Sequence, residues 1–99
     1  MLNWRMIMNQ SENAKNKMYT DIEEGENQFK RLLNQFGDDG MIYLERGRAY
    51  EYHEFFDKAA HDYKFALSLF PMQSWKETAS NHLSRVEQKI AERNKNKKR

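Results

Sequence analysis

The chain has 99 residues, a formal net charge of +2, a mean hydropathy of -1.10 and no cysteine. This length and polarity support one domain, and the missing cysteine excludes disulfides, thiol chemistry and cysteine-based metal sites. No apolar run approaches the ~20 residues that a membrane span requires, and the first ten residues hold too short an apolar run for a secretory signal. A cytoplasmic protein without membrane attachment is the expectation.

Charge is unevenly distributed along the chain. Residues 93–99 contain five of the 17 lysines and arginines and no acidic residue, which leaves twelve cations against 15 acids in the rest. The sequence therefore predicts a mildly acidic body followed by a basic tail.

Residues 1–18 form the least informative segment. Apolar residues occur early, and residues 9–17 are almost wholly polar. We expect a flexible or weakly helical N-terminal arm here, because chain termini are mobile unless packing fixes them. The alternative is that Trp4 and the nearby methionines dock on the body or on a partner.

Residues 20–36 have a helical pattern. Thr20 and Glu23 have the spacing of a capping box, in which the hydroxyl and the carboxylate bond free N–H groups of the first turn. The apolar face consists of Ile22, Phe29, Leu32, Leu33 and Phe36. Gly25 costs a helix ~1 kcal/mol relative to alanine, and its presence indicates that another helix packs closely against it.

Residues 40–71 contain two apolar stripes on either side of a break near Glu54 and Phe55. The first stripe is Tyr43, Gly47 and Tyr50, and the second is Ala59, Tyr63, Ala66, Leu67 and Phe70. Each recurs every three or four residues, as on one face of an α-helix. The mixture of small and large residues predicts two closely packed antiparallel helices, the second ended by Pro71.

These residues resemble a tetratricopeptide repeat, a helix–turn–helix of about 34 residues with sparse aromatic, small and proline positions. The matching residues are Tyr43, Gly47, Tyr50, Ala59, Tyr63, Ala66 and Pro71. Arg46 departs from the pattern, because a leucine is usual there, although Leu44 could fill part of the gap. The series Gly25, Phe29 and Leu32 repeats the spacing 34 residues earlier, which suggests half of a preceding repeat.

The last predicted helix runs from Ser74, with Glu77 completing a second capping box, to about Ile90. Its single apolar stripe is Trp75, Ala79, Leu83, Val86 and Ile90. A helix with one polar face can cover the exposed end of a repeat stack. The expected fold is therefore an all-α, short TPR-like helical stack. Residues 1–18 would be an arm, 19–92 the helical domain, and 93–99 a disordered basic tail.

Catalytic and metal chemistry find little support in the sequence. His53, Glu54 and Asp57 approximate the zinc-protease spacing, but the ligands of that motif must share one continuous helix. The break at Glu54 separates them, and His61 and His82 have no partner at ligand spacing. We expect a non-enzyme that holds neither a metal nor another cofactor.

The family resemblance implies a binding groove for a peptide or partner helix, lined by the first helix of each repeat. The corresponding candidates here are Met41, Leu44, Arg48, Glu51 and Tyr52. The competing interpretation is an ordinary solvated face. Relatives that hold the acidic C-terminal tails of chaperones use lysine and asparagine in this stretch, so that particular activity is not supported.

Two further partner hypotheses depend on exposed surfaces. The basic end could contact nucleic-acid phosphates or an acidic partner through Arg93, Lys95, Lys97, Lys98 and Arg99. Nucleic-acid binding is the weaker hypothesis, because no aromatic residue is interleaved with these charges. Short repeat stacks bury little surface, so we also expect self-association or tight docking. The exposed faces would come from the N-terminal arm and from the first helix, with Ile22, Phe29 and Leu33.

Overall fold

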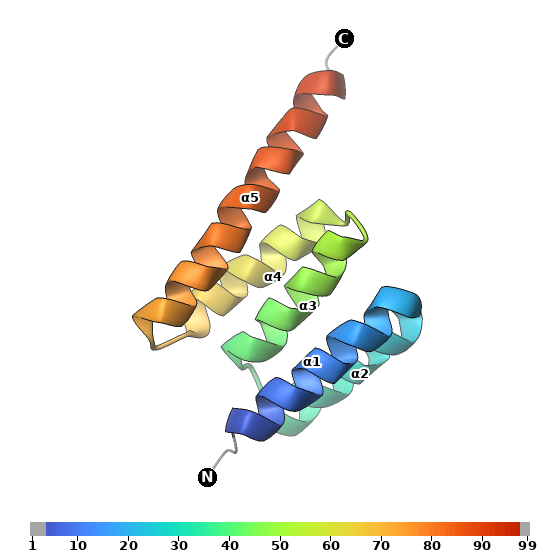
Figure 1. Ribbon diagram of the computed structural model, residues 1–99, viewed down its shortest axis with the longest axis vertical. Helices are drawn as coiled ribbons and strands as arrows, with labels where there is room; N and C mark the ends of the chain where they lie inside the picture. The colour runs from blue at the N-terminus through green and yellow to red at the C-terminus, as the bar shows by residue number, and fades with distance from the viewer. Residues whose placement is uncertain (1–3, 98–99) are drawn as a thin grey trace.

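The computed structural model describes residues 4–97, which fold into five α-helices without a strand (Figure 1). These are α1 (Trp4–Thr20), α2 (Ile22–Phe36), α3 (Gly40–Tyr52), α4 (Phe56–Leu69) and α5 (Gln73–Lys97). α1 pairs with α2 and α3 pairs with α4, while α5 packs along α4 and extends beyond the other helices. The predicted all-α fold is confirmed for the described residues.

The α3–α4 pair has the packing that its small and aromatic residues predict. A Cβ atom on Gly47 would lie 2.7 Å from a ring carbon of Tyr63, so only glycine lets the two helices approach this closely. Ala59, Tyr63 and Ala66 are fully buried. α3 ends before a turn in which Glu54 has a φ of 62°, and this turn separates the two helices as expected.

The prediction of a flexible N-terminal arm is wrong, because α1 is a packed helix. Its residues Ile7, Ala14 and Met18 are buried in the core. The helix was hard to recognise because its buried face also includes Ser11 and Lys15, which are 0% and 6% exposed. α1 contacts both α2 and α3, and it supplies the missing first helix of the preceding pair.

Gly25 marks the close crossing of α1 and α2. A Cβ atom at this position would lie 2.3 Å from the Cβ of Met18 and 2.4 Å from its Cα. The prediction that another helix packs against Gly25 is therefore confirmed, and the partner is α1.

Both predicted capping boxes are wrong. Thr20 is the last residue of α1, and its hydroxyl donates a hydrogen bond to the carbonyl of Lys17. Asp21 has an extended backbone and caps α2 instead, since its carboxylate accepts a bond from the N–H of Glu24. α5 begins at Gln73, so Ser74 lies inside the helix rather than before it.

The face expected to drive self-association is largely covered by the α1–α2 packing. Phe29 is fully buried, and Ile22 and Leu33 are only partly exposed. The prediction that these three side chains form an exposed face is therefore wrong, and self-association itself stays a prediction. Within residues 4–97, no helix is long and apolar enough to cross a membrane.

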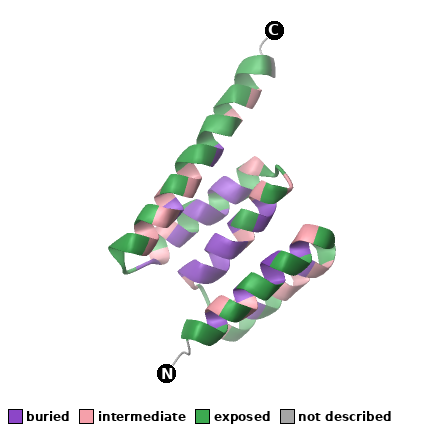
Figure 2. Ribbon diagram, viewed as in Figure 1, coloured by how far each residue is buried: buried purple, intermediate pink, exposed green. Residues whose placement is uncertain are grey.

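The C-terminal helix is longer than predicted. Ala79 and Val86 are fully buried on its single apolar stripe, and most of its remaining surface is exposed (Figure 2). α5 continues to Lys97, which corrects the prediction of disorder for residues 93–97. The predicted contacts of Lys98 and Arg99 lie outside the described residues.

Arg46 accounts for the departure from the repeat pattern. Its guanidinium makes two 2.8 Å hydrogen bonds to the carboxylate of Asp62, whose side chain is 1% exposed. Burial raises the pKa of Asp62, and the bonds from Arg46 oppose that rise. An ion pair between α3 and α4 therefore stands at the position where the sequence departs from the repeat pattern.

Candidate functional site: the inner face

Side chains of α1, α3 and α5 contribute to one surface, which we call the inner face. α3 lies between α1 and α5, while α2 and α4 form a layer behind them (Figure 1). α3 packs against α1 and is bonded to α5 through Glu51 and Arg85. Side chains from three separate parts of the sequence therefore meet on this face.

The first polar cluster joins α1 to α3. The Nζ of Lys15 lies 3.4 Å from the carboxylate of Glu45, and the two side chains are 8% and 6% exposed. Arg48 donates a 3.0 Å bond to the other oxygen of Glu45. Lys15 and Arg48 therefore both pair with the buried Glu45, and removing one partner of a buried ion pair is costly.

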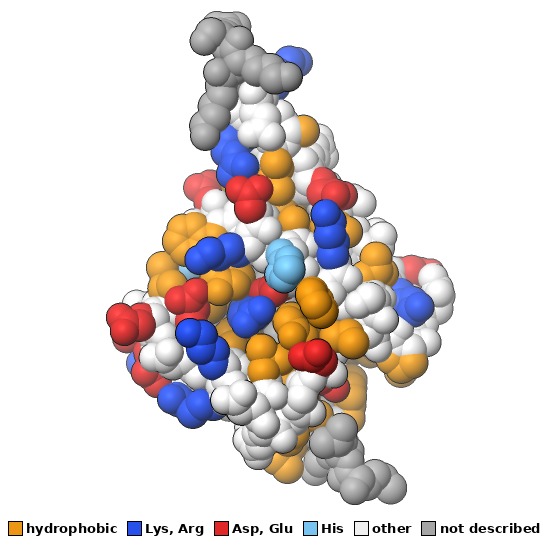
Figure 3. Space-filling view, turned by 180° about the vertical axis from the view of Figure 1, so that it is seen from behind, with side chains coloured by type: hydrophobic (Ala, Val, Ile, Leu, Met, Phe, Trp, Pro, Cys, Tyr) orange, Lys and Arg blue, Asp and Glu red, His pale blue; other side chains and the backbone are white. Residues whose placement is uncertain are grey.

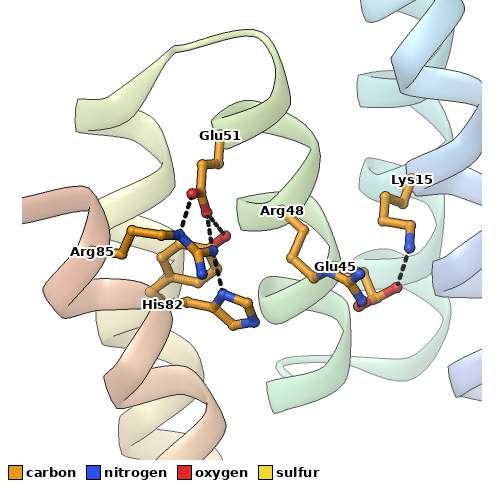
Figure 4. A network of polar contacts seen from close by, with 7 residues as sticks. Lys15, Glu45, Arg48, Glu51, His82 and Arg85 are labelled. Atoms are coloured by element: carbon orange, nitrogen blue, oxygen red, sulfur yellow. Dashed lines mark hydrogen bonds and ion pairs between the residues drawn. The ribbon is translucent and has the colours of Figure 1, made fainter. Parts of the chain in front are cut away.

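The second polar cluster joins α3, α4 and α5 (Figure 4). Arg85 makes bonds of 2.6 and 2.8 Å to Glu51, and the hydroxyl of Tyr63 donates a 2.7 Å bond to the same carboxylate. Burial opposes ionisation of Glu51, but the bonds from Arg85 and Tyr63 prevail and lower its pKa. Both oxygens of this carboxylate are therefore already occupied.

His82 completes the second cluster. Its ring stacks on that of Tyr63 with centroids 5.3 Å apart, and its Nδ1 lies 2.5 Å from an Arg85 nitrogen. Arginine can only donate, so Nδ1 accepts this bond and carries no proton. Burial and the nearby charges of Arg85 and Arg48 lower the pKa of His82.

Aromatic pairs lie at the two ends of the inner face. Near the beginning of α1 and α5, the rings of Trp4 and Trp75 are 6.2 Å apart, and Trp4 is 49% exposed. At the other end, the rings of Tyr52 and Tyr19 are tilted towards each other with centroids 4.3 Å apart, and Tyr52 is 63% exposed. α1 and α5 are thus joined at the tryptophan end and diverge from it (Figure 1).

The structure separates the five predicted groove residues into two groups. Met41 and Leu44 are each 2% exposed and belong to the core, so their assignment as groove residues is wrong. The error arises because α1, which was not expected, covers this part of α3. Arg48, Glu51 and Tyr52 do lie on the inner face, and Glu51 serves there as an anchor for Arg85.

Three contributors to this face were missed in the sequence: Lys15, His82 and Arg85. The repeat length contained a signal for two of them. Glu51 and Arg85 are 34 residues apart, and so are Arg48 and His82. α5 therefore presents its side chains to the inner face in the same register as α3, although it lacks the aromatic and small residues of the repeat.

The remaining candidate residues are scattered. The Nε2 of His53 contacts the carbonyl oxygen of Met18 at 2.7 Å, and Asp57 accepts a bond from Arg93. In the described part of the chain, no group of His, Cys, Asp or Glu is arranged to hold a metal ion. Lys95 is exposed near the end of α5.

Seen from behind, the outer layer mixes both signs of charge with hydrophobic side chains (Figure 3). Arg46 lies over the ring of Tyr43 at 5.3 Å, and Lys58 lies over that of Tyr50 at 5.4 Å. These cations are accompanied by Asp57 and Asp62 around a cavity of about 380 Å³. The outer layer therefore lacks the one-sided basic surface of a dedicated nucleic-acid binder.

Comparison with protein-family models, curated proteins and solved structures gives no match.

Proposed function

We propose that this protein is a non-catalytic protein–protein interaction module of the cytoplasm, a small adaptor or regulator that docks a partner on its inner face. The proposal is based on one observation: exposed arginine side chains on this face are held in place by buried carboxylates. Arg48 and Arg85 have side chains 42% and 47% exposed, and each is bonded to a carboxylate that is at most 13% exposed.

Such an arrangement favours binding because the contact groups are already oriented. Ordering a long side chain on association costs ~0.5–1.5 kcal/mol, and a preorganised arginine avoids part of this loss. Tyrosine, tryptophan and arginine are also the residues that most often dominate binding energy. Tyr52, Trp4 and the two arginines therefore provide the face with the side chains that an interface requires.

Site-specific photo-crosslinking in native lysate tests this proposal. A benzoylphenylalanine in place of Tyr52 should give a discrete crosslinked protein, because it stands on the inner face. The same group in place of exposed Lys64 on α4, in the layer behind, serves as the matched control. The identified partner, once purified, should bind the wild-type protein more tightly than an Arg48→Ala variant. Equal crosslinking at both positions would contradict inner-face docking.

Nucleic-acid association through the basic end is the alternative. It is favoured by the helical extension of α5, which carries cations away from the body. It is disfavoured by the 3.0 Å pairing of Arg93 with Asp57. Removing residues 94–99 distinguishes the two functions: the adaptor should keep its crosslinked partner, whereas a nucleic-acid binder should lose its salt-sensitive gel shift.

A further inference from the structure

The turn between α3 and α4 holds a cluster of aromatic rings. The centroid of the Phe55 ring lies 6.3 Å from that of Tyr50 and 5.9 Å from that of His53, and the Nζ of Lys58 lies 5.7 Å from it. The N–H of Phe55 donates a 2.9 Å bond to the carbonyl of Tyr50, which holds the turn. Phe55 is 40% exposed, so its ring offers a held aromatic face to solvent.

The basic end of α5 lies beside this turn and continues past it (Figure 1). The Nζ of Lys89 is 5.4 Å from the ring centroid of Phe56, and a nitrogen of Arg93 bonds to Asp57 at 3.0 Å. Lys89 and Arg93 are four residues apart and therefore share one side of the helix. Lys95 is exposed just beyond them. No aromatic residue is interleaved with these cations in the sequence, but the fold places aromatic rings next to them.

A cavity of about 320 Å³, which we call the turn cavity, lies where the turn meets α5. Its two acids are balanced by its two cations, and one such pair is the bond between Asp57 and Arg93. The cavity therefore suits a flat uncharged ring better than a phosphate. Within residues 4–97 the buried Nε of Arg93 has no hydrogen-bond partner, so an acceptor on such a ring would satisfy an unpaired donor. The lining residues are Glu54, Phe55, Phe56, Asp57, Lys58 and Arg93.

We propose that the turn cavity and the basic end of α5 together bind single-stranded nucleic acid, with a base stacked on Phe55 and the phosphates along α5. Aromatic stacking combined with a row of cations is how proteins bind single strands without sequence preference. Along residues 89–95 three cations outnumber one acid, and the sequence continues with Lys97, Lys98 and Arg99. Protein docking on the inner face and strand binding at the turn cavity use different residues.

Two other ligands fit these observations less well. A double helix keeps its bases stacked on one another, and aromatic side chains reach bases that are unstacked. An acidic polypeptide would match the cations of α5, but its carboxylates would meet Glu54 and Asp57 in the turn cavity. A strand avoids that repulsion because its uncharged bases can enter the cavity while its phosphates stay outside.

Fluorescence anisotropy with two labelled strands tests the role of the bases. One is an oligothymidylate of about 12 nucleotides, within the usual site size of such proteins, and the other is an abasic strand of the same length and charge. At low salt the thymidylate should bind roughly fivefold or more tightly, because only its bases can stack. Equal affinity for the two strands would overturn the stacking site, and no binding of either would overturn the whole proposal.

The aromatic contact is tested with Phe55→Leu, which keeps an apolar side chain but removes the aromatic face. Its affinity for thymidylate should fall to that for the abasic strand. Phe65→Leu is the matched control, because Phe65 is also 40% exposed but stacks on Tyr43 instead. This variant should bind as the wild type does, and melting curves establish that both variants are folded. Equal losses in the two variants would rule out the turn cavity as the site.

The cations are tested with Lys95→Gln, an exposed position where the change leaves the core intact. The slope of log affinity against log salt should become shallower by about 0.7 for thymidylate. Lys30→Gln, at an exposed position of α2, is the control and should leave the slope unchanged. A labelled glutamate peptide of the same charge should bind more weakly than thymidylate. If it binds as tightly, the surface recognises acidic polypeptides and the proposal is wrong.

Discussion

The two helix pairs of this protein have the same architecture but different cores. α3 and α4 meet through small and aromatic residues, with Gly47 against Tyr63. α1 and α2 also cross closely, at Gly25 and Met18, but α1 turns a lysine and a serine towards the protein interior. A helix can therefore belong to the core although its buried face is interrupted by polar residues, provided that a neighbouring helix supplies the partner for its buried charge.

The largest effect should come from the ion pair inside the second helix pair. Arg46→Leu restores the residue that the repeat pattern favours but leaves the Asp62 carboxylate buried without its partner. We expect a loss of about 3–5 kcal/mol in the free energy of unfolding, measured by urea denaturation. The double variant Arg46→Leu with Asp62→Leu should recover most of this loss, because apolar replacements of a buried pair are often neutral. A single variant as stable as wild type would show that the ion pair is dispensable.

The next largest loss of stability should come from replacing the glycines at the two helix crossings. Gly25→Ala places a methyl group against the backbone and Cβ of Met18. These atoms cannot move aside as the end of a flexible side chain could. We expect a loss of about 2–3 kcal/mol despite the gain in helix propensity. Gly47→Ala meets a Tyr63 ring instead, which can shift, and should cost less. A lower melting temperature for Gly47→Ala than for Gly25→Ala would mean that the α1–α2 pair tolerates separation better than the α3–α4 pair.

A smaller loss should follow from Lys15→Met. The substitution keeps the length and the apolar stem of the side chain, and Glu45 keeps its bond to Arg48. A loss of about 1–2 kcal/mol is expected in the same denaturation assay. Lys17→Met changes an exposed lysine on the same helix and should alter stability by less than about 0.5 kcal/mol. Identical results for the two lysines would contradict a role for the buried pair in holding α1.

The smallest effect concerns pH. Folding lowers the pKa of His82 below its ordinary value of 6.5, so the unfolded chain binds more protons as the solution becomes acidic. Stability contributed by neutral His82 is therefore present above pH 6.5 and is lost as pH falls towards the folded pKa. The melting temperature of wild type should decrease from pH 7.5 to pH 5.5 more steeply than that of His82→Gln. Parallel curves would show that His82 is not linked to folding.

Sequence patterns predicted the second pair well because its signal is local. Tyr63, Ala59 and Gly47 stand at repeat spacing and pack as that spacing requires. The capping boxes failed for a different reason: Thr20 fits the pattern, but Asp21 is adjacent and adopts the extended backbone of an N-cap. Thr20 and Asp21 are both acceptable N-cap residues. Which of them caps α2 depends on where α1 ends, and the local pattern does not specify that.

The candidate site was predicted only in part. Arg48 and Tyr52 lie on the inner face because α3 is a regular helix and its phase follows from the Tyr43 stripe. Met41 and Leu44 were misplaced because burial depends on the helix that lies over them. His82 and Arg85 come from a segment without a repeat signature, so only their 34-residue offset from α3 could have placed them.

The sequence by itself determined the helices from residue 22 to about residue 90, the close approaches at Gly25 and Gly47, and the single apolar stripe of α5. These features follow from side-chain periodicity and volume, which are local properties. The tertiary structure alone decided that residues 4–20 form a packed helix and that Lys15 is buried. It also decided that Arg48, His82 and Arg85 share one surface. The physical reason is that a buried or clustered charge is stable only beside its partners, and those partners come from distant parts of the chain.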